Sequence, residues 1–541
     1  MATTEVTEDE VDDKASGNDQ RAPQLVWGFR ALGLVLAALA WLALGGAAEL
    51  PPEGRMAAAI GVLMATWWIT EALPLSATAL LPIVLFPTFG VLSVLEATGP
   101  YADPIVFLFM GGFLIAIAMQ KWNLHRRIAL LTLSAVGTHP RRIILGMMIA
   151  TAFLSMWVSN TATTLMMLPI ALSVLTLVVE RTKSGGSTKA GDDTDDHDVT
   201  ARVAGGETIS QVVEDKAVRA FGVGLILSIA WSASIGGLGT LLGSPPNAIV
   251  AGYVSEELGE ELGFLQWMQL GVPIVVVFIA IAWVLITRVL FRSDLQEIPG
   301  GKEMIAGQLH SLGPMSRGER LVLAVFVGAA VMWVVPGLVF NISAVAEAAP
   351  WLDGLNDTVI AIVAGIILFA LPAEKGTSKM VLVWQDAQKG LPWGVLLLFG
   401  GGLSLARAVA SSGLDVWIGT QVEGLGVLPI VFLVMAVVTL VLFLTEVTSN
   451  TATAATFIPV LGGVALGIGA DSMTLLIPAA LAATCAFMLP VGTPPNAIVF
   501  GTGAVTIGQM ARGGFALNIV GVLLITGMSW LLGGWALGLQ F

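Results

Sequence analysis

The sequence predicts an all-α protein that crosses a membrane many times. Of the 541 residues, 56% are apolar and only 12% are charged, whereas a soluble protein carries roughly 25% charged residues. Apolar runs long enough to cross about 30 Å of hydrocarbon recur along the whole chain. Two polar motifs also occur twice each, which indicates an internal repeat.

The composition disfavours several other classes of protein. The single cysteine, Cys485, cannot form an intramolecular disulfide, and four histidines do not supply a Cys/His zinc cluster. The first twenty residues are acidic, the opposite of a signal peptide's basic start. Soluble enzymes, nucleic-acid binders and secreted disulfide scaffolds are therefore disfavoured.

The net charge of −13 is concentrated in two segments. Residues 1–20 hold seven acids and one lysine, and residues 180–216 hold nine acids and five bases. Charge runs of this kind are typical of solvated, disordered chain. We expect an acidic, disordered cytoplasmic tail over 1–26 and an acidic cytoplasmic insertion over 180–216, whose role the sequence leaves open.

The apolar runs predict about eleven transmembrane helices plus two re-entrant hairpins. The helices are expected near 27–49, 56–71, 74–92, 104–120, 218–252, 268–291, 319–339, 357–372, 391–410, 474–500 and 514–538. The hairpins are expected at 143–179 and 428–466, because Ser-Asn-Thr interrupts each stretch in its middle. A broken helix at membrane depth is tolerated only where it lines a protein cavity.

Basic residues set the orientation. With the N-terminus inside, most Lys and Arg residues fall on the cytoplasmic side, as the positive-inside rule requires. Arg55 and Arg407 are the clear exceptions. We therefore expect an integral protein of the cytoplasmic (plasma) membrane with a cytoplasmic N-terminus.

The repeat is visible in two motifs. The sequence SNTAT at 159–163 recurs at 449–453, a spacing of 290, and Gly-Gly at 111–112 recurs at 401–402 with the same spacing. GSPPNAIV at 243–250 recurs as GTPPNAIV at 492–499. In the expected orientation the two copies are inverted, and inverted repeats with interrupted helices are typical of secondary transporters, which bind substrate near the midplane.

The Ser-Asn-Thr tips suit an anion. The second half-helix of each hairpin begins there, so its first amide N–H groups lack helical partners and its dipole points positive charge at the tip. Ser, Asn and Thr add hydroxyl and amide donors. Two such tips could each hold one end of a dianion, and a dicarboxylate or a sulfate is the natural candidate.

The same segments also suit a hard cation. Ser155 and Thr445 each lie four residues before a tip serine, on the same helical face. Gly243 and Gly492 can expose carbonyl oxygens at the helix breaks, and oxygen-only sets suit Na⁺. Neither tip motif contains Lys or Arg, so a bound dianion would need co-bound cations to offset its charge.

At these motifs, and at TEVTSNTA over 445–452, the chain resembles the divalent anion/sodium symporter family of sodium-dependent dicarboxylate, citrate and sulfate carriers. The resemblance covers roughly residues 27–538. It implies a homodimer of eleven-span protomers, each with a scaffold domain and a transport domain that moves like an elevator.

The resemblance also implies how the chain is divided. Scaffold helices would occupy 27–140 and 292–427. A first set of transport elements would occupy 141–291, and a second set would occupy 428–541. The first set holds the hairpin 143–179, the insertion 180–216, the broken helix 218–252 and the helix 268–291; the second holds the hairpin 428–466, the broken helix 474–500 and the last helix 514–538.

Site residues are carried over from the family position by position. The first sodium site would use Ser155, Ser159, Asn160 and Gly243, and the second Thr445, Thr448, Asn450 and Gly492. Substrate would meet Ser159, Asn160, Thr161, Ser244, Pro245, Ser449, Asn450, Thr451, Thr493 and Pro494. Sodium is the expected coupling ion, with no organic cofactor. The expected partners are a dianionic small molecule, membrane lipid and a second copy of the chain, with no nucleic acid.

The function that the resemblance implies is sodium-coupled uptake of C4-dicarboxylates such as succinate, malate and fumarate. Citrate-preferring members of the family can depart from Ser at the first tip, whereas this chain keeps Ser at both tips. A sodium-coupled sulfate or citrate carrier and a sodium-independent dicarboxylate exchanger stay open as alternatives. A channel or a membrane enzyme is disfavoured. Glu446 lies beside the second tip, where it serves either a structural hydrogen bond or ion coupling.

Overall fold

In the computed structural model, residues 23–47, 49–137, 139–184, 209, 213, 215–293, 295, 301–339, 356–374 and 379–541 are described. These residues form helices, apart from connecting segments and one isolated bridge between Pro372 and Met380. The expected all-α class is confirmed. The acidic tail predicted over 1–26 and the insertion over 180–216 lie mostly outside the described residues.

The first half of the chain begins with a set of helices that precede the first tip. They are α2 (Pro23–Ala43), α3 (Pro52–Thr70), α4 (Leu75–Thr78), α5 (Leu81–Thr88), α6 (Val94–Thr98), α7 (Pro104–Lys121) and α8 (Leu124–Val136). The elements around and after the first tip are α9 (Pro140–Ser155), α10 (Asn160–Ser184), α13 (Lys216–Gly236), α14 (Pro245–Tyr253) and α15 (Phe264–Val284). Two π-helical segments, Val254–Leu258 (η4) and Leu285–Leu290 (η5), extend α14 and α15.

The second half repeats this plan. It opens with α16 (Gly301–Ser311), α17 (Arg317–Val339), α19 (Asp357–Ala370), α20 (Trp384–Gly390), α21 (Trp393–Ser411) and α22 (Leu414–Val422). The second tip and break follow within α23 (Ile430–Thr445), α24 (Asn450–Gly467), α25 (Ser472–Thr484), α26 (Pro494–Gly501) and α27 (Ile507–Leu537).

Within the described part of the chain, nine helices are long and apolar enough to cross a membrane. Four shorter apolar segments, among them Asp357–Ala370 and Ile430–Thr445, accompany them. The predicted span 74–92 divides into α4 and α5, where Pro82 starts the second piece. Each predicted hairpin is a pair of helices joined at its Ser-Asn-Thr tip; that both members enter from one side, and the total of eleven spans, stay predictions.

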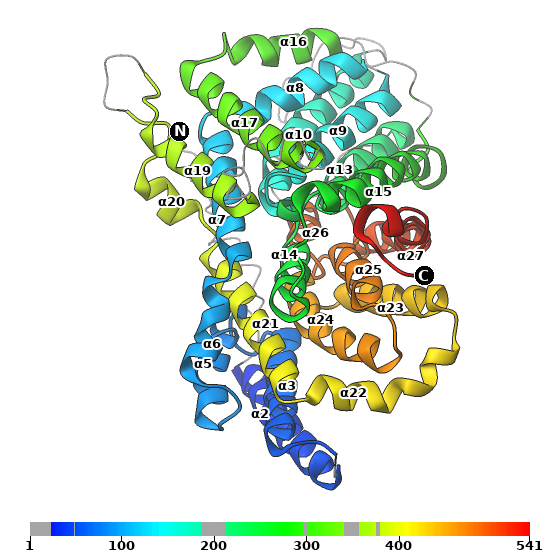
Figure 1. Cartoon of the computed structure of the whole chain (residues 1–541). Coiled ribbons are helices and arrows are strands. Elements are labelled where there is room, and N and C mark those ends of the chain that lie inside the picture. Colours follow the sequence, from blue (N-terminus) through cyan, green and yellow to red (C-terminus); the bar gives the residue numbers. More distant parts are fainter. Residues whose placement is uncertain are drawn as a thin grey trace.

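The two broken helices exchange partners between the repeats. From the first repeat, α14 packs against α24 and α25 of the second, whereas α26 of the second repeat packs against α10 and α13 of the first. Figure 1 shows α14 and α26 at the centre of the molecule, between these two sets. This crossing is what brings both tips and both breaks into one region.

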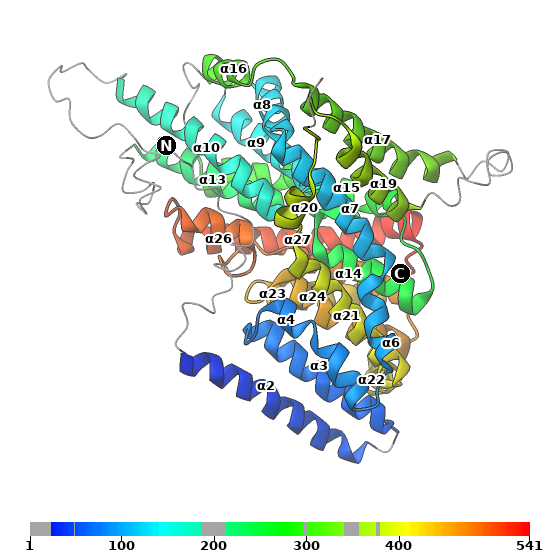
Figure 2. The same ribbon diagram turned by 90° about the vertical axis from the view of Figure 1, so that its left-hand side faces the viewer.

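Several of the other helices lie along one flank of this centre. In Figure 1, α3, α5, α6, α7 and α21 form a column beside the crossing, and Figure 2 shows α2 and α3 running side by side at its end. α7 packs closely on α19, and α2 on α3. The division into a scaffold and a moving domain stays a prediction.

The repeated Gly-Gly pair has a packing role in both copies. A Cβ on Gly111 would lie 2.5 Å from the Ala361 carbonyl carbon, and one on Gly401 would lie 2.5 Å from the Ala79 carbonyl oxygen. Any side chain there would clash with backbone that cannot move aside. Small residues allow this close helix approach inside membrane proteins.

Candidate functional site

The first tip is a short non-helical segment between α9 and α10. Ser155 is the last residue of α9, and Asn160 is the first of α10. The Ser159 hydroxyl accepts a hydrogen bond from the Ala162 amide at 3.2 Å, and the Ser159 carbonyl accepts one from the Thr163 amide at 2.9 Å. Ser159 therefore caps the restarted helix, which is why the chain breaks and resumes at this motif.

Four oxygen atoms meet beside the first tip. Asn160 Oδ1 lies 2.6 Å from Ser155 Oγ and 3.1 Å from each of the carbonyl oxygens of Ala233 and Gly243. Ser155 Oγ donates a hydrogen bond to the Ala233 carbonyl at 2.7 Å. Because Ala233 belongs to α13 and Gly243 to the break that follows it, we call this group the first oxygen cage.

The second tip builds the same arrangement from matching residues. Asn450 Oδ1 lies 2.7 Å from Thr445 Oγ1 and 3.1 Å from each of the carbonyl oxygens of Ala483 and Gly492. Thr445 Oγ1 donates to the Ala483 carbonyl at 3.1 Å. This group is the second oxygen cage, with threonine in place of the first cage's serine.

The two asparagine amides decide the chemistry of the cages. Each amide oxygen faces one hydroxyl oxygen and two carbonyl oxygens. If the amide turned by 180°, its nitrogen could donate hydrogen bonds to the same three oxygens. A cation among the four oxygens would instead be coordinated by the amide oxygen as it stands. The donors are hydroxyl, amide and carbonyl oxygens without sulfur or imidazole, so the residues present fit a hard cation such as Na⁺.

Glycines allow the breaks to approach the tips. A Cβ on Gly243 would lie 2.6 Å from the Gly237 carbonyl oxygen, and one on Gly237 would lie 2.9 Å from Asn160 Oδ1. In the second copy, a Cβ on Gly492 would lie 3.0 Å from the Glu446 carbonyl oxygen. Larger residues at these positions would push the carbonyl ligands out of the cages.

The asparagine of each Pro-Pro-Asn motif holds its break together. Asn247 Nδ2 donates to the carbonyls of Gly237 and Thr240, both at 2.8 Å. Asn496 Nδ2 donates to the carbonyls of Ala486 and Leu489 at 3.2 and 3.1 Å. These bonds satisfy carbonyls that the interrupted helix leaves without partners.

Four helix N-termini begin in this region. α10 and α24 begin at the two tip asparagines, and α14 and α26 begin at Pro245 and Pro494, directly after Ser244 and Thr493. The Ser244 hydroxyl lies 3.0 Å from the Thr484 hydroxyl, so the break of one repeat touches the end of α25 in the other. Helix N-termini carry partial positive charge and free N–H groups, which suits an anion.

The structure therefore gathers six of the predicted sodium residues into two sets. Ser155, Asn160 and Gly243 meet in the first cage, and Thr445, Asn450 and Gly492 meet in the second. The hydroxyl of Thr448 bonds instead to the Leu444 carbonyl at 3.0 Å and to Thr453 Oγ1 at 2.6 Å. The side chains of Thr448 and Ser159 are thus outside the cages.

The predicted substrate residues surround the cages with different exposure. Ser159, Asn160, Thr161, Pro245, Ser449, Asn450 and Pro494 are half-buried. Ser244, Thr451 and Thr493 are buried.

Glu446 is buried beside the second tip, and its carboxylate binds the break. Its two oxygens accept hydrogen bonds from the backbone amides of Phe487, Met488 and Leu489 at 2.7 to 3.1 Å. Asn518 Nδ2 of α27 donates to the same carboxylate at 2.7 Å. These five bonds favour the structural interpretation of Glu446.

Two cage ligands were invisible to sequence reasoning. Ala233 and Ala483 contribute only carbonyl oxygens, and an alanine in an apolar helix carries no sign of such a role. Ala233 precedes Gly243 by ten residues, but Ala483 precedes Gly492 by nine. Ala233 and Ala483 therefore do not have the same spacing to the glycine that follows them, so the sequence repeat could not identify them.

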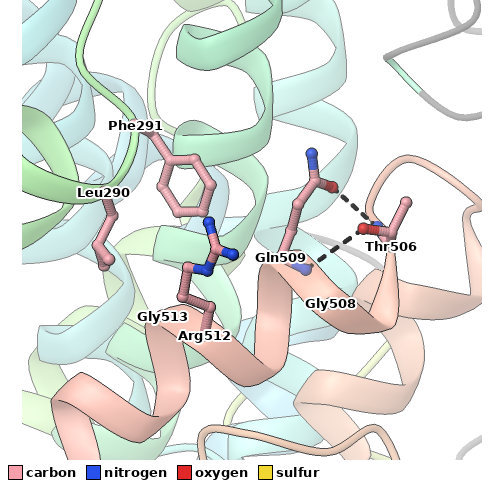
Figure 3. Close-up of a pocket in the computed structure, with 7 residues that line it drawn as sticks. All are labelled: Leu290, Phe291, Thr506, Gly508, Gln509, Arg512 and Gly513. Carbon is pink, nitrogen blue, oxygen red and sulfur yellow. Dashed lines mark hydrogen bonds between the residues drawn. The ribbon is translucent and has the colours of Figure 1, made fainter.

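A cavity of about 290 Å³ lies elsewhere, at the start of α27. Figure 3 shows Arg512 and Gln509 of α27 beside Phe291, which follows η5. None of the predicted substrate or sodium residues lines this cavity. It is therefore separate from the tips.

Comparisons with known proteins place these features in a family. The family model described as the sodium:sulfate symporter transmembrane region matches residues 26–536. The chain is 41% identical over 479 residues to the sodium-dependent dicarboxylate transporter SdcS of Staphylococcus saprophyticus, covering 88% of this chain and 86% of the relative. SdcS of Staphylococcus aureus strain RF122 is 40% identical over 477 residues, covering 88% and 85%.

Two solved structures share the fold at low sequence identity. The YdaH transporter of Alcanivorax borkumensis superposes with a TM-score of 0.54 and 14% identity, over 88% of this chain and 99% of that one. MtrF of Neisseria gonorrhoeae superposes with a TM-score of 0.51 and 11% identity, over 93% of each chain. The match of the family model across almost the whole chain, together with relatives of 40% identity, shows that this protein belongs to the sodium:sulfate symporter family, the divalent anion/sodium symporters.

Proposed function

We propose that this protein couples sodium entry to the uptake of a C4-dicarboxylate, such as succinate, malate or fumarate, across the cytoplasmic membrane. The observation that carries the proposal is the pair of oxygen cages, each joined directly to the N-terminus of a tip helix. Cations in the cages and an anion at the helix ends would occupy adjoining places. The two relatives described above, both named sodium-dependent dicarboxylate transporters, support the same chemistry.

Charge explains why the two ligands would depend on one another. The tip motifs contribute no basic side chain, so a dianion would rely on four helix ends, each equivalent to about half a positive charge. Two sodium ions in the cages would supply two further charges. An anion without sodium would therefore bind weakly, and sodium without the anion would lack its counter-charge.

The cages also suggest how binding would be sensed. Each asparagine amide either donates to its neighbouring oxygens or turns its oxygen toward a cation. In our proposal, sodium fixes the amide, and with it the first turn of α10 or α24. That turn presents Ser159, Thr161, Ser449 and Thr451 to one or the other carboxylate of the substrate.

Movement between the two membrane faces would follow the elevator scheme of the family. The cages would travel with the transport elements 141–291 and 428–541, against scaffold helices of 27–140 and 292–427 in a homodimer. The close packing between the two repeats at α14 and α26 supports movement of the two broken helices as one body.

Uptake of labelled succinate into proteoliposomes tests this proposal. Accumulation that needs an inward sodium gradient, and that potassium does not support, is the expected result. Uptake driven only by internal dicarboxylate would identify an exchanger on the same architecture. Absence of uptake under both conditions would contradict a dicarboxylate carrier.

Sulfate is the second candidate, because the family model that matches this chain is described by sodium:sulfate symport. Hydroxyl and amide donors at the tips would serve sulfate oxygens as well as carboxylates. Competition separates the two substrates. Succinate in excess should abolish uptake of the tracer, whereas sulfate and citrate in equal excess should leave most of it.

A further inference from the structure

Arg407 is one of two basic residues that violate the positive-inside pattern, and the structure gives it a partner. Its Nη1 lies 2.9 Å from Glu256 Oε2. Arg407 is near the end of α21, in the predicted scaffold, whereas Glu256 is in η4, directly after the broken helix α14 of the predicted transport elements. α14 and η4 both pack against α21, as Figures 1 and 2 also show for α14.

This ion pair lies among further carboxyl groups. Asp103, which is 4% exposed, caps the N-terminus of α7, and its carboxyl group interacts with the charge of Glu256. Two neighbouring carboxylates repel each other. Glu256 therefore has both a paired cation and a neighbouring acid in the predicted scaffold.

Two more acids face the pair. One oxygen of Glu257 and one of Asp415 are buried and accept no hydrogen bond from the described residues. The pKa of the Glu257 carboxyl is raised to about 6, mainly by burial; Arg407 lowers it, and the neighbouring Glu256 and Asp415 raise it. Burial likewise raises the pKa of Asp415.

Titratable groups around the pair come from several of the elements packed on it. They are Glu96 of α6, Asp103 of α7, Tyr253 of α14, Glu257 of η4 and Asp415 of α22. Arg407 is the one cation in this set of described residues. Its hold on Glu256 is therefore opposed by whichever of the acids are ionised.

We propose that Arg407 is a positioning residue for the transport cycle. Through its ion pair with Glu256, it holds the moving helix α14 against the fixed helix α21. Protonation of the surrounding acids sets the strength of this contact. The proposal rests on the proposed elevator function, because it needs the two helices to belong to different moving parts. Separation of α14 from α21 would part Glu256 from Arg407 and bring the buried Glu257 carboxyl into water, where it ionises more readily. Acid pH therefore favours the conformation described here, and that preference is lost as the pH rises through about 6.

Hydrogen exchange gives a readout that does not need transport. The amides of residues 254–263 should exchange about two- to five-fold more slowly at pH 5.5 than at pH 7.5, after correction for intrinsic rates, as expected for a partly exposed ion pair. R407Q and E256Q should lose this difference, and R407K should retain most of it. The matched control is K121Q, which breaks a pair of similar exposure, Lys121–Asp386 at 2.6 Å, within the predicted scaffold.

Sodium-driven uptake gives the second readout. The ratio of R407Q to wild-type initial rates should be largest at pH 5.5 and approach the K121Q ratio at pH 7.5. The substrate's own titration cancels in each ratio, because both proteins are assayed in the same buffer. The proposal is overturned if folded R407Q and E256Q proteins keep the wild-type pH dependence of amide hydrogen exchange. If R407Q does not fold, the comparison of E256Q with R407K decides. Wild-type protein that shows the exchange difference but no uptake would reject the proposed function and keep the ion-pair claim.

Discussion

The two tips have matching geometry but are held in place by different contacts. Each places an asparagine oxygen against one hydroxyl and two carbonyls, at 2.6 to 3.1 Å. Around the first tip, Trp157 stacks on Phe264 and on Trp333, with ring centroids 5.9 and 6.3 Å apart. At the matching position of the second tip stands Val447, which is 55% exposed.

The second tip is held by a buried carboxylate. Glu446 accepts hydrogen bonds from the amides of the second break and from Asn518, whereas the matching residue of the first tip, Met156, packs on Gly239. Both tips contact their own breaks, since Thr240 of the first break donates a hydrogen bond to the Met156 carbonyl. The first tip adds aromatic residues of α15 and α17, and the second adds the Glu446 carboxylate. The duplicated sequence retains the arrangement of polar groups at the tips, and the supporting contacts have diverged.

Loss of a cage asparagine should have the largest effect. Asn160→Ala and Asn450→Ala each remove the oxygen that faces the other three, so uptake should fall by about 100-fold or more, equivalent to roughly 3 kcal/mol of lost binding. Initial uptake rates at a sodium concentration below saturation for the wild type provide the measurement. Melting temperatures in potassium buffer should match the wild type, and normal uptake by either folded variant would reject the cages as the coupling site.

Loss of the Glu446 carboxylate should come next. Glu446→Ala leaves three backbone amides and the Asn518 amide without their acceptor, at a cost of about 3–5 kcal/mol of folding free energy. Met156→Leu, the matched change at the first tip, should cost less than about 1.5 kcal/mol, because it keeps an apolar side chain of similar volume. Equal melting temperatures for the two variants would contradict the assigned difference between the tips.

A smaller loss of stability is expected at Trp157, the residue that follows Met156 in the first tip, and at Val447, its counterpart in the second. Trp157→Ala removes the stack with Phe264 and Trp333 and should destabilise the protein by about 2–4 kcal/mol, since the ring is only half-buried. Val447→Ala changes an exposed side chain and should stay within about 0.5 kcal/mol of the wild type. Thermal unfolding in detergent measures both, and a larger loss for Val447→Ala would reverse the comparison.

The repeated motifs predict where the chain breaks and most of the predicted side chains that meet there. Ser155 and Thr445 could be assigned because a hydroxyl four residues before a tip lies on the same helical face. The carbonyls of Ala233 and Ala483 could not, because every residue has a carbonyl and only the fold selects one. Thr448 is the opposite case: its sequence position suggested a place in the cage, but its hydroxyl hydrogen-bonds to Thr453 instead.

Local packing set the other differences from expectation. The predicted span 74–92 is two short helices, because prolines fix where helices begin. The role of Trp157 could not be foreseen, since its partners Phe264 and Trp333 are distant in sequence. Arg407 was visible as an exception to the charge pattern, but its partner Glu256 became apparent only when α14 and α21 were seen to pack.

The dependence of thermal stability on sodium tests the paired cages most directly. Melting temperatures of the wild type, Ser155→Ala and Thr445→Ala should be compared in sodium and potassium chloride at equal ionic strength. Two cages that bind sodium predict that sodium raises the wild-type melting temperature, because a ligand of the folded state stabilises it by mass action, and that each variant needs several-fold more sodium for the same rise. Equal melting temperatures in the two salts, or variants that respond to sodium like the wild type, would contradict the assignment of these cages as sodium sites.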